Sequence, residues 1–417
     1  MNQEELKIAG RTAKKASAVL AGLSEQEKNG LLLNIHDALI EGREQLISAN
    51  AVDLEKADDY GLSPAMKERL ALSPKKIDDM AEGVAQLALL PDPCGKVLSR
   101  RVLANGLEII RTSVPFGVIA MIYESRPNVT VDAAALCLKS GNACILRGGK
   151  EAHYTNAALT GLIQKVLNDR GLPSAAVTSI LDPERSLVNT LLTMRDIVDL
   201  AIPRGGAGLI RFVVENSTVP VIETGSGICH TYVDQTADPD KAIPIILNAK
   251  TQRPSVCNAM ETLLIHKDAA PKLVPALFNA LKEKGVEIRG DEAVRALDPT
   301  VKQASPLDWE TEYGDLILSV KIVGSLEEAI SHISTYGTRH SECILSRDPQ
   351  SIQTFMNAVD AACVYSNAST RFTDGFEFGF GAEIGISTQK LHVRGPMGLE
   401  ALVTYKYKIF GNGQVRE

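Results

Sequence analysis

Cys257 is the cysteine whose surroundings best suit a nucleophile. It lies in the polar segment Thr251-Gln252-Arg253-Pro254-Ser255-Val256-Cys257-Asn258, which joins an expected helix to an expected strand. Arg253 favours the thiolate form, and a loop exposes a thiol to substrate. Cys94, in a proline-rich loop, and Cys229 are weaker candidates. The remaining cysteines lie in apolar runs and are interpreted as small buried hydrophobic residues: Cys137, Cys144, Cys343 and Cys363.

Two glycine-rich turns follow expected strands and precede expected helices. The first is Arg147-Gly148-Gly149-Lys150, and the second is Arg204-Gly205-Gly206-Ala207-Gly208. Backbone amides at such a turn bind phosphate, and open α/β sheets bind ligands at the carboxyl ends of their strands. Neither turn is a Gly-x-Gly-x-x-Gly fingerprint, so a plain tight turn or a solvated turn remains the alternative. Together they favour a nucleotide cofactor.

Glu223 ends another apolar run and is followed by Thr224-Gly225-Ser226-Gly227. A carboxylate in this position is either an exposed strand terminus or an acid or base of the site. Arg126-Pro127-Asn128 follows a further strand, where it is either a helix N-terminus or a source of one more cation.

A long polar, glycine-rich segment runs from Tyr365 to Gly398. Loops of this length in compact domains are functional or disordered, and the interleaved Phe and Ile residues argue against disorder. We expect a substrate-facing loop with these polar side chains: Asn367, Ser369, Thr370, Arg371, His392 and Arg394.

The expected elements form an α/β architecture. Apolar residues recur at helical spacing over residues 4–90, and Asn105-Gly106 between two β-rich runs predicts a hairpin over residues 97–114. From Phe116 short apolar strands alternate with helices, which predicts parallel βαβ units. The expected strands are 118–123, 143–147, 177–181, 197–202 and 219–223, then 261–266, 316–323, 342–346 and 363–366. The expected helices between the first of these strands are 128–140, 152–169, 184–194 and 206–216.

Two α/β domains in tandem are the simplest account, the second beginning near Ile228. The run Ala401–Phe410 alternates like a strand without a neighbouring partner in sequence, so we expect it to pair with the 97–114 ribbon or with another subunit.

Composition restricts the function classes. The 417 residues carry a net charge of −7, and 45% of them are hydrophobic. An acidic balance of this size leaves no global field for nucleic acid, which makes DNA and RNA unlikely partners. There is no Cys-x-x-Cys pair, no Cys/His metal spacing, no signal peptide and no apolar run of membrane-spanning length. We therefore expect a cytoplasmic protein without a bound metal.

The order of these motifs resembles the aldehyde dehydrogenase superfamily, and most closely its branch that reduces γ-glutamyl phosphate. The likeness runs over nearly the full length. The segments that carry it are Glu124-Ser125-Arg126-Pro127-Asn128-Val129-Thr130, Pro203-Arg204-Gly205-Gly206, Gln252 to Asn258, Asn367 to Gly375 and Gly381 to Lys390. The resemblance implies reduction of L-glutamyl 5-phosphate by NADPH to glutamate 5-semialdehyde and phosphate, the second step of proline synthesis from glutamate.

The resemblance also implies roles at the active site. Cys257 is the nucleophile that forms a thioester. The oxyanion donor is the backbone N–H of Cys257 or a side chain near Ser125 or Asn128, because this chain has Ser125 where the superfamily usually has an asparagine. Glu223 matches the superfamily's general base, and here we expect it to support the site. Glu312 is one position out of register with the glutamate that binds the nicotinamide ribose.

Cofactor and substrate residues follow in the same way. Arg147 stands where the superfamily usually has a lysine at the adenosine ribose and suits the 2′-phosphate of NADPH. The full expected cofactor set is Arg147, Lys150, Arg204, Gly205, Gly206 and Gly225. The expected substrate set is Arg126, Arg253, Ser369, Thr370, Arg371, His392 and Arg394.

The predicted organisation has three parts. Residues 1–95 and 115–225 form an NADPH-binding domain, and residues 226–399 form the catalytic domain. Residues 96–114 and 400–412 form a β arm for oligomerisation. We expect a homo-oligomer whose substrate comes from a glutamate kinase, a possible partner.

Two rival functions remain open. One is another acylating dehydrogenase of the same fold, which would use acyl-CoA or free aldehyde in place of acyl phosphate. The other is a cysteine hydrolase or amidotransferase, which requires a histidine beside Cys257. His230, His266 and His392 are the histidines whose segments could approach that thiol.

Overall fold

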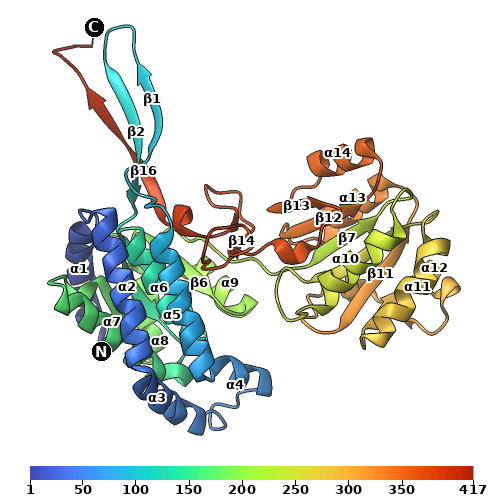
Figure 1. Cartoon of the computed structure of the whole chain (residues 1–417), viewed down its shortest axis with the longest axis horizontal. Coiled ribbons are helices and arrows are strands. Elements are labelled where there is room, and N and C mark those ends of the chain that lie inside the picture. Colours follow the sequence, from blue (N-terminus) through green and yellow to red (C-terminus); the bar gives the residue numbers. More distant parts are fainter. Residues whose placement is uncertain (125, 417) are drawn as a thin grey trace. The chain divides into compact units, whose positions relative to one another are not determined.

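A computed structural model describes residues 1–124 and 126–416, and the chain divides into two compact units (Figure 1). Unit 1 comprises residues 1–224, 379–385 and 397–417, and unit 2 comprises residues 225–378 and 386–396. Each unit is built around its own parallel β-sheet. In the described chain, no helix has the length and apolar character that a membrane span requires.

Five helices open unit 1: α1 (Gln3–Leu20), α2 (Glu25–Glu41), α3 (Arg43–Glu55), α4 (Pro64–Leu70) and α5 (Pro74–Leu89). Each of the first two helices begins with a capping box. The side chain of Asn2 or Ser24 accepts a hydrogen bond from the backbone N–H of a glutamate three residues later, and the glutamate side chain accepts one from the backbone N–H of the cap residue. The helical spacing predicted over residues 4–90 is confirmed, because Leu6, Leu20 and Leu32 are fully buried.

The unit 1 sheet has the order β5-β4-β3-β6, with every pair parallel. Its strands are β3 (Val118–Tyr123), β4 (Ala143–Arg147), β5 (Val177–Ser179) and β6 (Leu200–Arg204). The connecting helices are α6 (Pro127–Lys139), α7 (His153–Asp169), α8 (Arg185–Thr193) and α9 (Ala207–Asn216). These elements confirm the predicted βαβ units.

The predicted strand 219–223 was wrong as a strand. This segment makes one parallel bridge, between Ala201 and Val221. Its backbone contacts are Ala201 N–H to Pro220 O and Ile222 N–H to Ala201 O. Pro220 has no N–H to donate, which limits further pairing.

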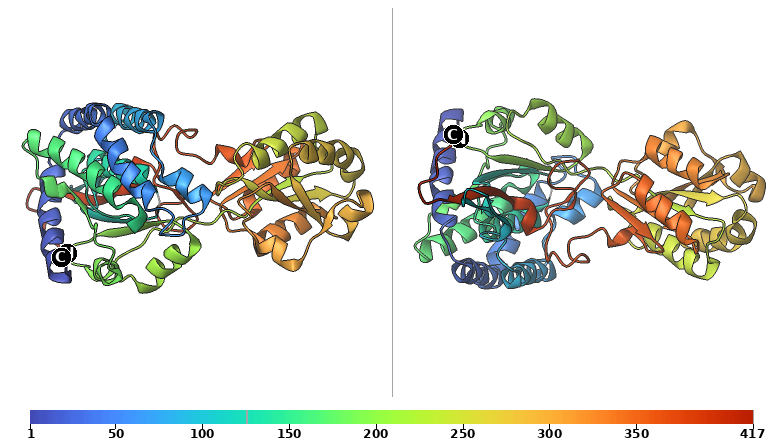
Figure 2. Two further views of the ribbon diagram at one scale, coloured as in Figure 1. Left: turned by 90° about the horizontal axis from the view of Figure 1, so that it is seen from below. Right: turned by 90° about the horizontal axis from the view of Figure 1, so that it is seen from above.

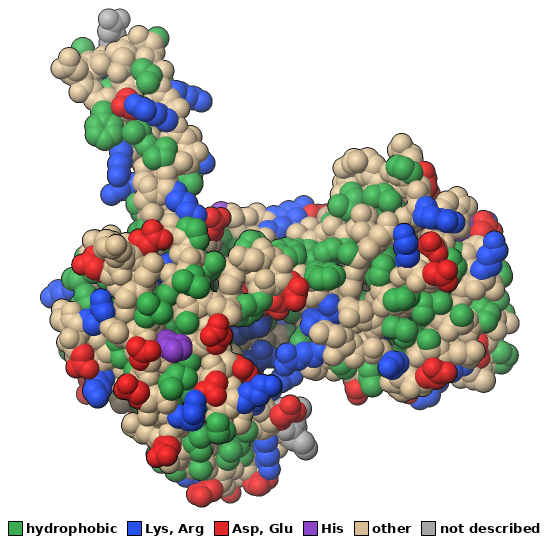
Figure 3. Space-filling view, in the orientation of Figure 1, with side chains coloured by type: hydrophobic (Ala, Val, Ile, Leu, Met, Phe, Trp, Pro, Cys, Tyr) green, Lys and Arg blue, Asp and Glu red, His purple; other side chains and the backbone are tan. Residues whose placement is uncertain are grey.

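An antiparallel three-stranded arm completes unit 1, in the order β1-β2-β16. β1 (Val97–Val102) and β2 (Glu108–Pro115) form the predicted hairpin, and Gly106 has φ of +83° in its turn. β16 (Val403–Phe410) pairs with β2 over its whole length, which confirms the predicted partner. Figure 3 shows hydrophobic and basic side chains along the arm, and the exposed apolar ones include Val102, Tyr407 and Ile409.

Unit 2 contains a seven-stranded parallel sheet with the order β10-β9-β11-β8-β7-β12-β13. Its strands are β7 (Cys229–Val233), β8 (Met260–His266), β9 (Glu287–Gly290), β10 (Lys302–Gln303), β11 (Ile317–Val323), β12 (Ser341–Leu345) and β13 (Cys363–Ser366). Its helices are α10 (Pro239–Thr251), α11 (Ala270–Glu283), α12 (Glu292–Leu297), α13 (Leu326–Tyr336) and α14 (Pro349–Ala358).

Helices cover both faces of this sheet (Figure 2). Leu263 packs with Ile246 and Leu277 of α10 and α11, while the next residue, Leu264, packs with Phe355 on the other face. Strands buried on both faces read as continuous apolar runs. Three of these strands were not predicted from the sequence: β7, β9 and β10.

The long segment after β13 contains little regular structure. It includes η4 (Thr370–Phe372), β14 (Ile386–Ser387), β15 (Gly395–Pro396) and η5 (Leu399–Leu402). β14 and β15 pair with each other in unit 2, whereas residues 379–385 belong to unit 1. The other short helices are η1 (Lys150–Ala152), η2 (Ser174–Ala176) and η3 (Pro306–Glu310).

Candidate functional site

Cys257 lies in a turn between α10 and β8 and is partly exposed. A buried ion pair joins the two ends of this loop: Lys250 Nζ lies 2.6 Å from Glu261 Oε2, and both side chains are almost fully buried. Burial lowers the pKa of Lys250 and raises that of Glu261 to about 7. The pair therefore fixes where the helix ends and the strand begins on either side of the thiol.

The glycine-rich segment after Glu223 passes close to the cysteine backbone. A Cβ on Gly227 would lie 1.5 Å from the carbonyl oxygen of Cys257, so any side chain here would displace the loop. Cys229 Sγ donates to the same carbonyl at 3.2 Å. Glu312 lies against the backbone of Gly227, and burial raises the pKa of its carboxyl. This turn thus holds the cysteine backbone from one side.

The predicted loop after β13 holds Asn258, the residue that follows the cysteine. Thr370 Oγ1 donates to the Asn258 carbonyl at 2.7 Å, and Asn258 Nδ2 donates to the Thr373 carbonyl at 2.8 Å. The Thr373 hydroxyl bonds in turn to Ser341 and Tyr365, each at 2.7 Å. Loop and cysteine turn therefore form one hydrogen-bonded network.

Arg371 is the cation that this network places at the cysteine loop. Its guanidinium donates to Gln252 Oε1 at 2.7 Å and to Asn258 Oδ1. Burial lowers the Arg371 pKa, the Arg253 charge lowers it further, and Cys257 acts in the opposite direction. The charges of Arg371, Arg253 and the thiol therefore interact. Ser369 is buried and accepts from the Arg371 backbone N–H at 3.3 Å.

Three other residues predicted near the thiol, two histidines and Arg394, have acidic partners of their own. His230 is buried and its Nδ1 lies 3.0 Å from Glu342, while His266, at the far end of β8, lies 3.7 Å from Asp268. Arg394 pairs with Asp360 at 2.9 Å. Burial lowers the pKa of His392, which belongs to the same unit.

The first glycine-rich turn follows β4 in unit 1. The Arg147 guanidinium donates to the carbonyls of Gly148 and Pro183, and the Lys150 ammonium lies 4.8 Å from the Tyr60 ring centroid. A Cβ on Gly148 would lie 2.2 Å from Asn156 Nδ2. Two cations at the carboxyl end of a parallel strand suit the ribose and 2′-phosphate end of a dinucleotide.

The second turn follows β6 and begins α9. The backbone N–H of Gly206 donates to Glu124 Oε2 at 2.8 Å, and a Cβ on Gly205 would lie 2.5 Å from the same oxygen. A carboxylate bound at this amide shows that the helix end accepts an anion. The turn therefore fits a dinucleotide phosphate, which would take the place of Glu124.

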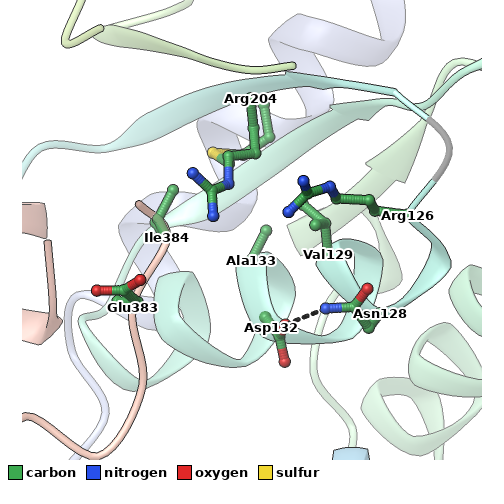
Figure 4. Close-up of a pocket in the computed structure, with 9 residues that line it drawn as sticks. Arg126, Asn128, Val129, Asp132, Ala133, Arg204, Glu383 and Ile384 are labelled. Carbon is green, nitrogen blue, oxygen red and sulfur yellow. Dashed lines mark hydrogen bonds between the residues drawn. The ribbon is translucent and has the colours of Figure 1, made fainter. Parts of the chain in front are cut away.

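A pocket in unit 1 collects side chains of both charges (Figure 4). It is lined by Met121, Arg126, Asn128, Val129, Asp132, Ala133, Arg204, Glu383 and Ile384. The Arg126 guanidinium extends toward Arg204, whose own guanidinium is turned toward Ile384 and Glu383 (Figure 4). Asn128 Nδ2 donates to Asp132 Oδ2 at 3.0 Å. Burial raises the Asp132 pKa to about 6, although the Asn128 bond and the Arg204 charge act in the opposite direction.

Sequence reasoning missed the acidic members of this pocket. Asp132 lies four residues after Asn128 on the otherwise apolar helix α6, so helical spacing from the Arg126-Pro127-Asn128 motif was a signal for it. Glu383 gives no such signal, because residues 379–385 reach the pocket only through the tertiary fold. Ser125, a predicted oxyanion donor, lies outside the described residues. Glu223 is half-buried, in the segment of the chain that joins α9 to the Gly225–Gly227 turn.

Comparisons with known proteins agree with this architecture. A model of the aldehyde dehydrogenase family matches residues 1–305. Two gamma-glutamyl phosphate reductases are similar over 413 residues, at 57% identity in Moorella thermoacetica and 56% in Carboxydothermus hydrogenoformans, covering 99% of this chain and 99% and 100% of theirs. The crystal structure of gamma-glutamyl phosphate reductase from Thermotoga maritima matches with a TM-score of 0.97 and 47% identity, covering 99% of this chain and all of that one.

Proposed function

Because the chain belongs to the aldehyde dehydrogenase family, within its γ-glutamyl phosphate reductases, we propose that it reduces L-glutamyl 5-phosphate to L-glutamate 5-semialdehyde in proline biosynthesis. The observation that carries the catalytic assignment is Cys257 in a fixed turn, with the Arg371 guanidinium donating to Asn258, the next residue along the chain. The family does not match a cysteine hydrolase, and the 57% identity favours acyl phosphate over acyl-CoA as the substrate.

In the proposed mechanism the Cys257 thiolate attacks the acyl carbon. A C–S bond forms, the tetrahedral oxyanion collapses, and the C–O bond to phosphate breaks. The backbone N–H of Cys257 is the proposed oxyanion donor. Arg371 and Arg253 neutralise the departing phosphate. Ser369 and Thr370 contribute indirectly, because they hold the loop that carries Arg371 in place. The resulting thioester is then reduced, and cleavage of the C–S bond releases the aldehyde and regenerates the thiolate.

A nicotinamide cofactor, when bound, supplies the hydride for the reduction. We assign Arg147, Lys150, Gly205 and Gly206 to the dinucleotide, with Gly225 as a further contact. Arg147 selects NADPH, since a guanidinium binds the 2′-phosphate through two parallel hydrogen bonds.

Glu223 is proposed to support the site and not to activate water. A base that activates water would hydrolyse the thioester to glutamate, whereas reduction of the thioester requires no water. Glutamate formation from semialdehyde and NADP without phosphate, compared between the wild type and Glu223→Gln, tests this role. Hydrolysis by the wild type that vanishes in the variant would make Glu223 a hydrolytic base.

We also propose an oligomeric state, a cellular compartment and a partner for this enzyme. The exposed apolar residues of the arm support its use between subunits of a homo-oligomer. No disulfide joins the cysteines of the described chain, which supports a reducing cytoplasm. A labile acyl phosphate favours transfer from a glutamate kinase as partner.

The decisive assay is oxidation of glutamate 5-semialdehyde with NADP and with NAD, each with and without phosphate. We expect phosphate-dependent activity that prefers NADP. Arg147→Gln should reduce that preference by about tenfold, on the scale of one charge-assisted hydrogen bond. Activity that requires coenzyme A in place of phosphate would contradict the substrate assignment.

A further inference from the structure

The pocket formed by Arg126, Asn128, Asp132, Arg204 and Glu383 has a charge pattern that the catalytic chemistry does not use. Reduction of an acyl phosphate requires a thiol, an oxyanion donor and cations for phosphate. None of these steps needs a carboxylate, yet two carboxylates line this pocket opposite two guanidinium groups (Figure 4). A site for a simple anion would contain cations without acids.

We propose that this pocket binds the zwitterionic head of the substrate, its α-carboxylate between Arg126 and Arg204 and its α-ammonium at Asp132. This assignment rests on the proposed function, since it identifies the end of the substrate remote from the reacting carbon. It moves the Arg204 side chain from the dinucleotide to the amino acid. The Gly205-Gly206 backbone keeps its role at the cofactor.

The arrangement of the side chains supports this division. The Arg126 guanidinium extends toward Arg204, and Ala133, whose side chain is short, lies below the space between the two groups (Figure 4). A carboxylate accepts hydrogen bonds from two guanidinium groups through its separate oxygens. Arg204 also lies against Gly385, where a Cβ would be 3.0 Å from its terminal nitrogen, so the segment after Glu383 packs directly on this guanidinium.

Asp132 is suited to an ammonium ion for an electrostatic reason. Its carboxylate accepts one hydrogen bond from Asn128 and has the charge of Arg204 nearby, yet burial still raises its pKa to about 6. Burial therefore destabilises the ionised carboxylate by more than Asn128 and Arg204 stabilise it. A cation bound at the carboxylate would offset that cost, because an opposite charge favours the ionised form. Asn128 orients the carboxylate and is a positioning residue.

The test compares two aldehydes that differ only in the ammonium group. Glutamate 5-semialdehyde carries both head groups, whereas 5-oxopentanoate keeps the carboxylate and the aldehyde and lacks the ammonium. Wild type should prefer the semialdehyde by about tenfold to hundredfold in kcat/KM. Asp132→Asn, which keeps the side-chain size, should remove that preference by slowing only the semialdehyde. Glu215→Gln, an exposed acid on α9, is the matched control and should keep it.

Arg204→Gln supplies a second, independent result. Because both aldehydes carry the carboxylate, this variant should raise KM for both alike and leave their ratio unchanged. Its affinity for NADPH, measured by fluorescence titration without substrate, should equal that of wild type. Weakened NADPH binding with unchanged KM would return Arg204 to the cofactor site and overturn its assignment here.

The outcomes separate this proposal from the proposed function. If the wild type shows no phosphate-dependent oxidation of the semialdehyde, the function itself fails. If the wild type is active and Asp132→Asn keeps the wild-type preference, the ammonium site is wrong and the function stands. Melting curves confirm folding of each variant, and Arg204→Gln still decides the carboxylate site if Asp132→Asn does not fold.

Discussion

The cysteine loop of unit 2 and the charged pocket of unit 1 use ionisable groups in opposite ways. Around Cys257 the ion pair of Lys250 and Glu261 serves the loop itself, and Arg371, which we also assign to the departing phosphate, donates to two side chains of that loop. In the pocket, Asp132 has one hydrogen bond, and burial still raises its pKa to about 6. Charges satisfied within the protein fix a geometry. Charges left at a cost in free energy indicate a ligand.

The largest effect on the reaction rate should come from removing the Cys257 thiol, which the cysteine loop holds in place. Cys257→Ala should lower the rate by at least about a thousandfold, the loss expected for a covalent nucleophile. NADPH binding should be unaffected, since Cys257 is not among the residues assigned to the dinucleotide. Cys94→Ala, a change at a half-buried thiol of unit 1, is the matched control and should remain active. A Cys257→Ala enzyme with more than about a thousandth of the wild-type rate would refute covalent catalysis at this residue.

The next effect concerns the ion pair at the ends of the cysteine loop. Lys250→Met should destabilise the protein by about 3–5 kcal/mol, because Glu261 would remain buried without its partner. The double variant Lys250→Met, Glu261→Met should recover much of this loss. Urea unfolding measures both. Equal stability of wild type and Lys250→Met would show that the pair does not hold the loop.

A smaller effect is expected at the phosphate cation. Arg371→Gln should raise KM for glutamyl phosphate by about tenfold to hundredfold, on the scale of a hydrogen bond to a charged group. Arg394→Gln provides a comparison, because Arg394 already pairs with Asp360 and should change KM less. Steady-state kinetics with both variants decide between them. A larger effect for Arg394 would move the phosphate site.

The smallest effect tests the free-energy cost in the pocket. The Asp132 pKa is raised from 3.8 to about 6, so the folded state binds the proton more tightly and stability falls as pH rises between these values. Asp132→Asn should therefore stabilise the free protein above pH 6 by about 1 kcal/mol, discounted because the pocket is open to solvent. The difference should vanish below about pH 4. Melting temperatures measured against pH will show it, and identical curves would contradict the raised pKa.

Sequence patterns predicted most of the fold because each pattern had a local cause. Apolar periodicity predicted the helical stretch 4–90 that contains α1 to α5, the alternation with strands predicted α6 to α9, and Asn105-Gly106 located the hairpin. β7 was missed because the adjacent polar residues His230 and Thr231 interrupt its apolar run, although both are buried, His230 against the tertiary partner Glu342. Pro220 ended the strand predicted at 219–223.

The candidate site divides in the same way. Cys257, Arg371 and the glycine turns lie in segments whose composition is unusual, so sequence alone indicated them. Asp132 becomes a neighbour of Arg204 only when α6 and β6 pack together, and Glu383 joins them only through the fold of residues 379–385 within unit 1. No local pattern encodes that contact, and the prediction of Arg204 at the cofactor was made without it.

The central claim is that a thioester forms on Cys257, and peptide mass spectrometry tests it most directly. Enzyme mixed with glutamate 5-semialdehyde and NADP without phosphate, then quenched in acid, should carry one γ-glutamyl group on the peptide that contains Cys257. Addition of phosphate before the quench should remove it, because phosphate releases the acyl group. An acyl group on another residue, or turnover with no acylated Cys257 at any time, would contradict the account.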